Sequence, residues 1–228
     1  MVLPSDRDPV RPHDVTHAAE SVTQAFAPAV GMEWSVPAGG LEWSVEQTIA
    51  HMLAPAKYAL YLASGSTRFI AAGLKPWSDA TRAERLDALV GVARALAGVA
   101  AASPPAARGF HALGMVDAEG FVALGCLELL VHGYDVARGL GLAYEPPDGL
   151  CARVLARLFP WVDHPAGPAW TALLQATGRA GATTERDVWM PHPAPLDEWD
   201  GSIPVPDPRP VIEWVQQDPG RWQPRYQS

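Results

Sequence analysis

The sequence has few of the residues on which several protein classes depend. It contains two cysteines in 228 residues, Cys126 and Cys151, and they form no Cys-x-x-Cys pair. Two cysteines in apolar helical surroundings do not provide the disulfide framework of a small secreted domain. We therefore expect two reduced, buried thiols in a cytoplasmic protein.

Positive charge is scarce as well. Lys and Arg total 17 against 25 Asp and Glu, which gives a net charge of −8, and the arginines are scattered along the chain. This balance argues against a nucleic-acid partner. The longest apolar stretches are interrupted by His, Glu, Arg or Gly, so none predicts a membrane span. The first residues lack a charged start followed by an apolar core, so we expect no signal peptide and no membrane partner.

Helical periodicity is what the sequence does have. Apolar residues recur at helical spacing up to about residue 180, and no segment shows a convincing strand pattern. The spacing predicts helices at about 14–27, 44–64, 80–102, 118–140, 148–162 and 169–177. Long helices that can pack antiparallel, without strands between them, predict an all-α bundle.

The first two helices carry local signals at their ends. Asp14 is a candidate N-cap of the first, and Ser44 with Gln47 forms the capping-box arrangement at the start of the second. Pro55 falls inside the second helix. Because proline cannot donate a hydrogen bond to the carbonyl of His51, we expect a kink beside that histidine.

The last part of the chain has a different composition. Residues 182–228 hold nine of the 23 prolines and four of the nine tryptophans. This proline density excludes a helical domain, whereas a free tail would be poor in aromatic residues. We expect an extended C-terminal strap, pinned by its tryptophans and carrying a short helix near 211–217. The composition does not decide which face it covers. We expect residues 1–13 to form an N-terminal tail and residues 14–181 to form the helical bundle.

The helix at 118–140 carries a polar cluster. Glu128, His132 and Asp135 stand four and three positions apart, which places all three on one helix face. Their surroundings are mostly apolar, so the helix is expected to be buried. Unpaired burial of a carboxylate and an imidazole would be costly. A metal ion or a hydrogen-bond network should therefore satisfy them.

His51 is the candidate partner of this cluster. If the second and fourth helices face each other in the bundle, His51 approaches Glu128 and His132. Two imidazoles and a carboxylate suit zinc or another divalent first-row metal, with further positions open to water or substrate. The alternatives are a surface Glu–His pair worth roughly 0.2–0.5 kcal/mol, or a buried ion pair with His51 as an ordinary core residue.

Two sequence motifs also resemble a known family. Trp43-Ser-Val-Glu-Gln-Thr-Ile-Ala-His51, followed by Glu128-Leu-Leu-Val-His132-Gly-Tyr-Asp135-Val-Ala-Arg-Gly, resembles the N-terminal domain of mycothiol-dependent maleylpyruvate isomerases, within the DinB-like superfamily. The similarity covers about residues 13–180. It implies a DinB-like four-helix bundle with extra helices, in which His51, Glu128 and His132 hold a divalent metal, commonly zinc.

The resemblance also implies a kind of chemistry. Members of that family resemble thiol S-transferases and isomerases that use a low-molecular-weight thiol such as mycothiol. It implies a metal-dependent enzyme that activates a small thiol for addition to an electrophilic small molecule. The maleylpyruvate isomerases carry a separate C-terminal domain, whereas here the strap follows the bundle, so the resemblance does not imply maleylpyruvate as the substrate. A non-catalytic ligand-binding bundle and a repurposed enzyme of secondary metabolism remain alternatives.

Several other residues have open roles. Asp135 either orients His132 or bonds Arg138 or the backbone of a neighbouring helix. Tyr134 and Trp43 either line a pocket or simply pack. Cys126 points elsewhere on its helix and is not expected to be a ligand. The remaining histidines are expected at the surface or in loops: His13, His17, His111, His164 and His192.

Overall fold

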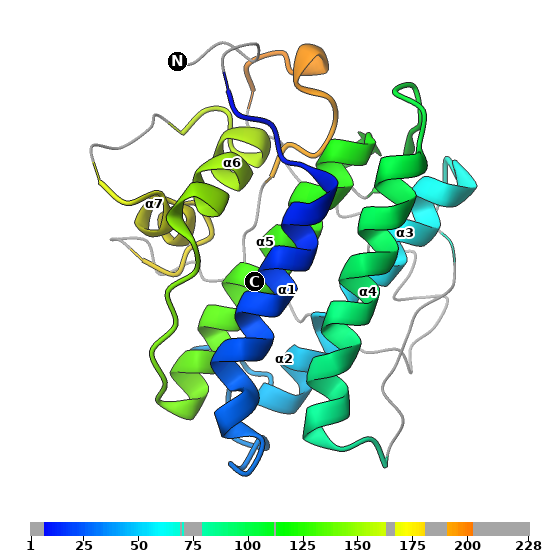
Figure 1. Cartoon of the computed structure of the whole chain (residues 1–228). Helices are drawn as coiled ribbons and strands as arrows, with labels where there is room; N and C mark the ends of the chain where they lie inside the picture. Colours follow the sequence, from blue (N-terminus) through cyan, green and yellow to red (C-terminus); the bar gives the residue numbers. More distant parts are fainter. Residues whose placement is uncertain are drawn as a thin grey trace.

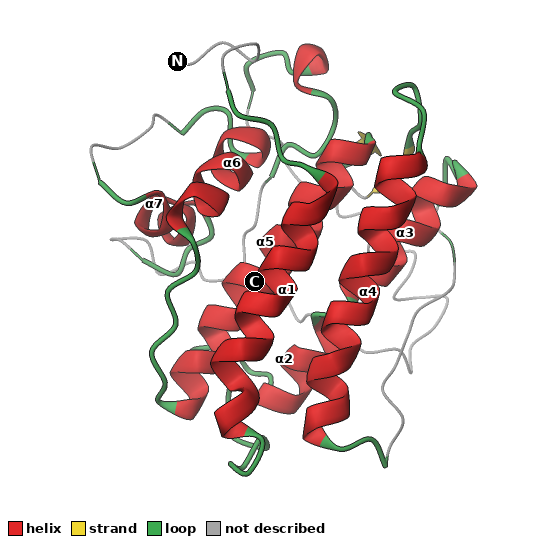
Figure 2. Cartoon of the chain, in the orientation of Figure 1, coloured by secondary structure: helices red, strands yellow, loops and turns green. Residues whose placement is uncertain are grey.

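The protein is mostly helical, as the sequence predicts (Figures 1 and 2). The computed structural model describes residues 7–68, 70, 79–111, 113–162, 167–180 and 191–202. Helices α1, α3, α4 and α5 lie side by side, and the short helix α2 packs against α5 and α4. The helices are α1 (Pro12–Phe26), α2 (Val45–His51), α3 (Ala54–Ser64), α4 (Arg82–Ala102), α5 (Ala118–Leu140), α6 (Asp148–Leu158) and α7 (Ala169–Ala176). Short 3₁₀ turns are η2 (Ala27–Ala29) and η3 (Leu196–Glu198).

Helix α5 is the centre of the core. It begins at the N-cap Asp117, whose side chain accepts from the Gly120 N–H at 2.7 Å, and ends at Gly141 with a left-handed φ of 67°. Among the described residues it is the one helix long and apolar enough to cross a membrane. However, 89% of its most apolar 18-residue window is buried in the protein, as in a core helix. The polar cluster of Glu128, His132 and Asp135 therefore lies on a core helix.

The second predicted helix is divided in two. Its start is confirmed: Ser44 Oγ accepts from the Gln47 N–H at 3.2 Å, and Gln47 Oε1 accepts from the Ser44 N–H at 2.9 Å. The helix then stops at His51 and restarts at Ala54, with Pro55 in the first turn of α3. Proline tolerates that position because its missing N–H would have no partner there. The expected kink is thus a full break.

The sequence shows no convincing strand pattern, but the structure contains one small sheet. Strands β1 (Gly109–His111) and β2 (Gly114–Val116) form a small antiparallel hairpin between α4 and α5. Each is three residues long, too short for an alternating pattern to appear in the sequence. Gly109 permits the hairpin to lie against α3, because a Cβ there would be 2.6 Å from the Tyr61 carbonyl oxygen.

The proposed N-cap at Asp14 was also wrong. Helix α1 begins at Pro12, and Asp14 sits in its first turn, where Oδ2 accepts from the Arg11 N–H at 2.8 Å. The Asp14 side chain is buried, and Arg153 of α6 donates to its two oxygens at 2.6 and 3.1 Å. Burial raises the pKa of Asp14, but the hydrogen bonds from Arg153 and the Arg11 N–H outweigh this and lower it.

Replacing Asp14 with asparagine is expected to lower the free energy of unfolding at pH 7 by about 1.5–3 kcal/mol. A carboxylate with a lowered folded-state pKa contributes stability above its unfolded pKa of about 4, and that contribution is lost as the pH falls through the folded pKa. Urea unfolding at pH 7 and pH 3 should therefore show a difference that shrinks in acid. The exposed Asp8→Asn should change stability little, and a pH-independent loss in Asp14→Asn would contradict the pairing.

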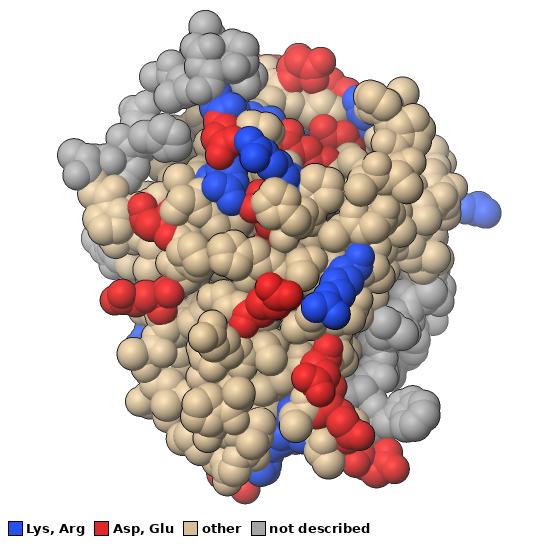
Figure 3. All heavy atoms as spheres, in the orientation of Figure 1, with Lys and Arg blue, Asp and Glu red and all other residues tan. Residues whose placement is uncertain are grey.

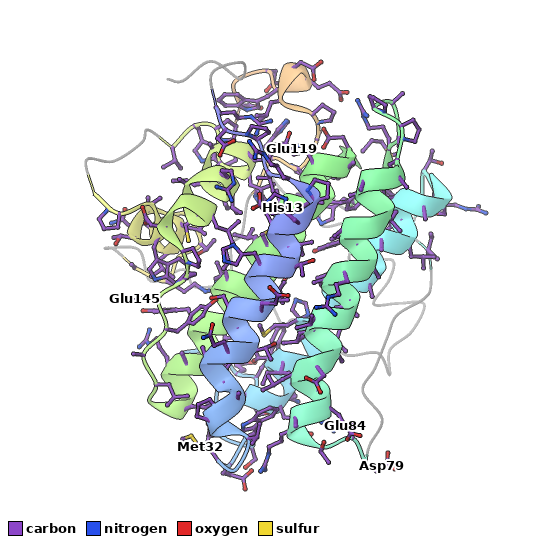
Figure 4. The ribbon with its side chains drawn as sticks, viewed as in Figure 1. His13, Met32, Asp79, Glu84, Glu119 and Glu145 are labelled. Atoms are coloured by element: carbon purple, nitrogen blue, oxygen red, sulfur yellow. The ribbon has the colours of Figure 1, made fainter. Side chains whose placement is uncertain are left out.

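The N-terminal segment and the described part of the strap both lie against the start of α5. Arg7 forms an ion pair with Glu119, and the Val10 N–H donates to the same carboxylate at 2.8 Å. Figure 4 labels Glu119 at that end of α5, beside His13 at the start of α1. Residues 8–11 therefore run close to the body and include the buried Val10.

The strap residues 191–202 are held by α6. Buried Arg157 donates to the carbonyl oxygens of His192 and Pro193 at 3.1 and 3.0 Å. The ring centroid of Trp199 lies 6.2 Å from that of Trp161, so one strap tryptophan packs against the body as expected. Trp189, Trp214, Trp222 and the short helix expected at 211–217 lie outside the described residues.

Candidate metal centre

The three residues singled out by the sequence converge. His51 Nε2 and His132 Nε2 lie 3.2 and 3.4 Å from the same atom, Glu128 Oε2. One ligand atom from each residue lies within 4.8 Å of the other two. The imidazole rings stand nearly perpendicular, with centroids 5.0 Å apart. Both Nε2 atoms are thus directed at one small volume next to the carboxylate.

Local sequence explains this placement. Glu128 and His132 are one turn apart on α5, so their side chains stack on one face. His51 is the last residue of α2, which contacts α5. The break before Pro55 turns the following chain into α3 and leaves His51 at a helix end, pointing inward. His51 and Glu128 are 77 residues apart in the sequence, and the packing of α2 against α5 brings them together in space.

Burial of the cluster is uneven. The side chains of His132 and Glu128 are 6% and 13% exposed, whereas that of His51 is 29% exposed. The Trp43 ring lies next to both imidazoles, with centroids 5.1 Å from His51 and 6.0 Å from His132. Trp43 therefore forms part of the site, one of the two roles the sequence left open. Solvent and small molecules therefore have greater access to the cluster from the His51 side than from the α5 side.

Tyr58 is a site residue that the sequence reasoning missed. It lies on α3, is almost fully buried, and its hydroxyl donates to Glu128 Oε1 at 2.8 Å. Burial and the Glu128 carboxylate raise the Tyr58 pKa well above its ordinary value, so it is a neutral donor. Tyr58 follows His51 by seven residues, or two turns of the expected helix, and this spacing could have indicated that both side chains lie on the same face. Tyr58 occupies one carboxylate oxygen and leaves the other to face the imidazoles.

His132 is oriented by a carboxylate behind it. Asp135 Oδ2 lies 3.1 Å from His132 Nδ1, and Arg179 donates to Oδ2 and Oδ1 of Asp135 at 2.9 and 3.3 Å. The side chains of Asp135 and Arg179 are each 5% exposed. The orienting role of Asp135 is therefore the one observed, while Arg138 lies over the Tyr134 ring. Arg179 follows α7 and carried no signal in the sequence.

The charges of these groups are strongly coupled. Burial would raise the pKa of Glu128, but His51 and hydrogen bonds from both imidazoles hold it well below its usual range. Burial would lower the pKa of His132, but its bonds to Asp135 and Glu128 raise it. Burial likewise raises the pKa of Asp135, and the bonds from His132 and Arg179 outweigh this and lower it. Glu128 is thus an anion at neutral pH, as a metal ligand must be.

The other candidate residues lie elsewhere. Tyr134 packs edge-on to Trp170 at 5.8 Å. Cys126 and Cys151 are buried thiols, and burial raises both pKa values, that of Cys151 to about 12. His13 lies 3.7 Å from Asp14, and His192 is in the strap. His164 falls outside the described residues. His111 lies nearer to the centre than expected, with its ring 6.1 Å from that of Tyr58.

The donor set fits a divalent ion. Tetrahedral zinc with bonds of about 2.0–2.1 Å requires donor atoms about 3.3–3.4 Å apart, close to the two separations measured from Glu128 Oε2. Two imidazoles and one carboxylate are a frequent ligand set for catalytic zinc, which keeps an open position. The Asp135–His132 pair also has the arrangement in which a carboxylate orients a metal-ligating imidazole. The chain matches no protein-family model, no curated protein and no solved structure.

Replacing Arg179 with methionine is expected to weaken zinc binding about tenfold, because Asp135 would lose the donor that fixes it behind His132. Competition with a chromophoric chelator would measure the affinity. Arg94→Met, which removes an exposed arginine of α4, is the matched control and should leave the affinity unchanged. Equal affinities in both variants would contradict the orienting role of Asp135 and Arg179.

Proposed function

We propose that this chain is a metal-dependent enzyme that activates a small thiol and joins it to an electrophilic small molecule. The observation that carries the proposal is the convergence of His51, Glu128 and His132 on one point. The resemblance of the two sequence motifs to thiol-dependent isomerases, and with it a DinB-like bundle, supports the same assignment. A divalent ion bound there would lower the pKa of a coordinated thiol, making the thiolate available near neutral pH.

The residues of this chain have distinct parts in that chemistry. His51, Glu128 and His132 would hold the ion, probed first with zinc. Tyr58 holds Glu128 Oε1, and Asp135 with Arg179 holds His132 Nδ1. These contacts fix the ligand side chains before any ion binds. A fixed, mostly buried ligand set reduces the reorganisation needed when charge develops.

The chain offers no cysteine as an alternative nucleophile at the described site. Cys126 and Cys151 are fully buried, and neither belongs to the convergent group. A thiolate must therefore come from a co-substrate such as mycothiol or another low-molecular-weight thiol. Its sulfur would form a bond to the electrophilic carbon, and a leaving group would depart with its electron pair. If the thiolate instead adds to a double bond, the π electrons of that bond move onto the substrate. The bond can then rotate, and departure of the thiolate restores the double bond, which gives isomerisation.

We also propose a cytoplasmic location, because small thiols are kept reduced there and both cysteines of this chain are buried free thiols. On the face shown in Figure 3, basic groups are scattered and often lie beside acidic ones, which favours a small-molecule substrate over nucleic acid.

The test is a two-substrate assay. 1-Chloro-2,4-dinitrobenzene is offered with mycothiol, glutathione or bacillithiol to protein loaded with zinc, with and without a chelator. We expect turnover only when thiol and metal are both present. The His132→Ala variant should behave like the chelated protein. Turnover at the full rate without any thiol would contradict the proposal and favour the alternative of a repurposed enzyme of secondary metabolism.

A further inference from the structure

The described strap residues 191–202 cross the end of the bundle at which α5 begins (orange in Figure 1). They open with the run Pro191-His-Pro-Ala-Pro195, in which the three prolines are buried and the two residues between them are half-buried. Proline restricts its own φ and keeps the preceding residue extended, so this run loses little conformational freedom on docking. Pro195, with φ −51° and ψ 141°, lies in the polyproline II region. The strap therefore docks as a preformed extended segment.

The body of the protein offers a groove that fits this segment. Arg157 of α6, whose side chain is 0% exposed, donates to the carbonyl oxygens of His192 and Pro193. The His192 N–H donates to the Leu158 carbonyl oxygen at 2.7 Å. Gly120 of α5 leaves room for the strap, because a Cβ there would lie 2.2 Å from the Pro193 carbonyl oxygen. The groove thus pairs the backbone of an extended Xaa-Pro run and buries its rings, as in polyproline recognition.

The strap also contacts the β1–β2 hairpin on both sides. Glu198 Oε1 lies 3.9 Å from Nη2 of Arg108, the residue before β1. Gly114 begins β2, and a Cβ on it would be 4.0 Å from the Cβ of Ala194. The docked strap therefore supports the hairpin from the side opposite to α3.

The hairpin in turn lies beside the metal centre. A Cβ on Gly109 would be 2.6 Å from the Tyr61 carbonyl oxygen, so β1 lies directly on α3. The ring of His111, at the end of β1, is 6.1 Å from the ring of Tyr58. Tyr58 is 4% exposed and donates to Glu128. The hairpin therefore covers the edge of the centre at which α3 holds Glu128.

We propose that the strap is a latch for this edge of the metal centre. When the strap is docked in its groove, the hairpin stays against α3 and covers Tyr58. When the strap leaves, the hairpin can move away from α3, and solvent and small molecules reach the Tyr58–Glu128 pair. The ligand chemistry of the groove is an extended Xaa-Pro-Xaa-Pro run, supplied by this chain itself. The latch goes beyond the proposed function, because it controls access whatever reaction the centre performs.

Replacing Pro191, Pro193 and Pro195 together with serine tests the latch without changing any residue of the body. Hydrogen exchange of the full-length chain is followed by mass spectrometry. We expect exchange at least about tenfold faster in both the strap and the hairpin, and unchanged exchange in α4, because docking protects only the first two from opening. Serine at the exposed Pro104 and Pro105 is the control and should change none of the three.

Gly120→Ala tests the same latch from the groove side. The added methyl group meets the Pro193 carbonyl oxygen, so exchange of the strap and the hairpin should again become faster. Gly98→Ala in α4 is its control, because a Cβ there meets nothing within 4 Å. A synthetic peptide of residues 191–202, added to the triple serine variant, should restore protection of the hairpin. The same peptide with serine at its three proline positions should not.

Zinc release connects the latch to the centre. A chromophoric chelator should remove zinc from the triple serine variant at least about tenfold faster than from wild type, as expected when a covering element opens. If wild type binds no zinc, the proposed metal-dependent function fails, and hydrogen exchange alone decides the latch. Three results would overturn the latch: a strap that exchanges as slowly in both variants as in wild type, a hairpin unchanged when the strap exchanges faster, or an unaltered rate of zinc release.

Discussion

Glu128→Gln is expected to abolish zinc binding and thiol-dependent turnover together, with a loss in kcat of roughly 10³-fold or more. Glu128 Oε2 is the atom that both imidazoles face, and the amide replaces its negative charge with a neutral dipole. A metal ion typically supplies several kcal/mol of transition-state stabilisation, and each 1.36 kcal/mol is about tenfold in rate. Zinc titration and the two-substrate assay measure the two losses.

The matched control for this variant is Glu20→Gln. Glu20 is an exposed residue of α1 that pairs with Arg94 at 3.6 Å on the surface. The substitution makes the same chemical change far from the centre and should leave zinc affinity and kcat unaltered. If Glu128→Gln kept full zinc affinity, the carboxylate would be a partner of the imidazoles and not a ligand.

Tyr58→Phe is expected to weaken zinc binding and lower kcat by about 10–100-fold, the usual cost of losing a group that orients a metal ligand. The hydroxyl is the donor to Glu128 Oε1, which phenylalanine would leave buried without that partner. The remaining ring keeps its contact with Phe121, 5.7 Å between centroids, so the fold should persist. Chelator competition and steady-state kinetics give the two quantities.

Tyr61→Phe is the control on the same helix. Its hydroxyl is also in a buried environment but accepts from the Ile70 N–H at 3.1 Å, away from the three proposed ligands. It should cost some stability and leave zinc affinity nearly unchanged. Similar effects of both substitutions on zinc affinity would show that Tyr58 acts through the packing of α3 and not through Glu128.

The sequence was most informative where the signals are local. The Ser44–Gln47 capping box and the stacking of Glu128 over His132 depend on spacings of three and four residues, which helix geometry fixes directly. The position of Pro55 located the break between α2 and α3, although not its extent. These features predicted a disturbed backbone beside His51 and a Glu–His pair inside the core, and the structure shows that the disturbance is a helix end.

Long-range contacts explain what the sequence did not predict. Asp135 and Arg179 are 44 residues apart, and nothing in an isolated arginine indicates a carboxylate in another part of the fold. Asp14 was interpreted as an N-cap because its partner in the fold, Arg153, is 139 residues away in the chain. His111 was expected at the surface or in a loop because a three-residue strand gives no periodic signal.

The most direct test of the account is the metal content of the wild-type protein. The protein is purified without chelators and without a metal-affinity tag, and elemental analysis is performed beside His132→Ala prepared identically. We expect about one equivalent of a divalent first-row metal, most readily zinc, in wild type and none in the variant. A wild-type protein that contains no such metal and takes up none on incubation with zinc, or a variant that retains it, would contradict the assignment of His51, Glu128 and His132 as a metal centre.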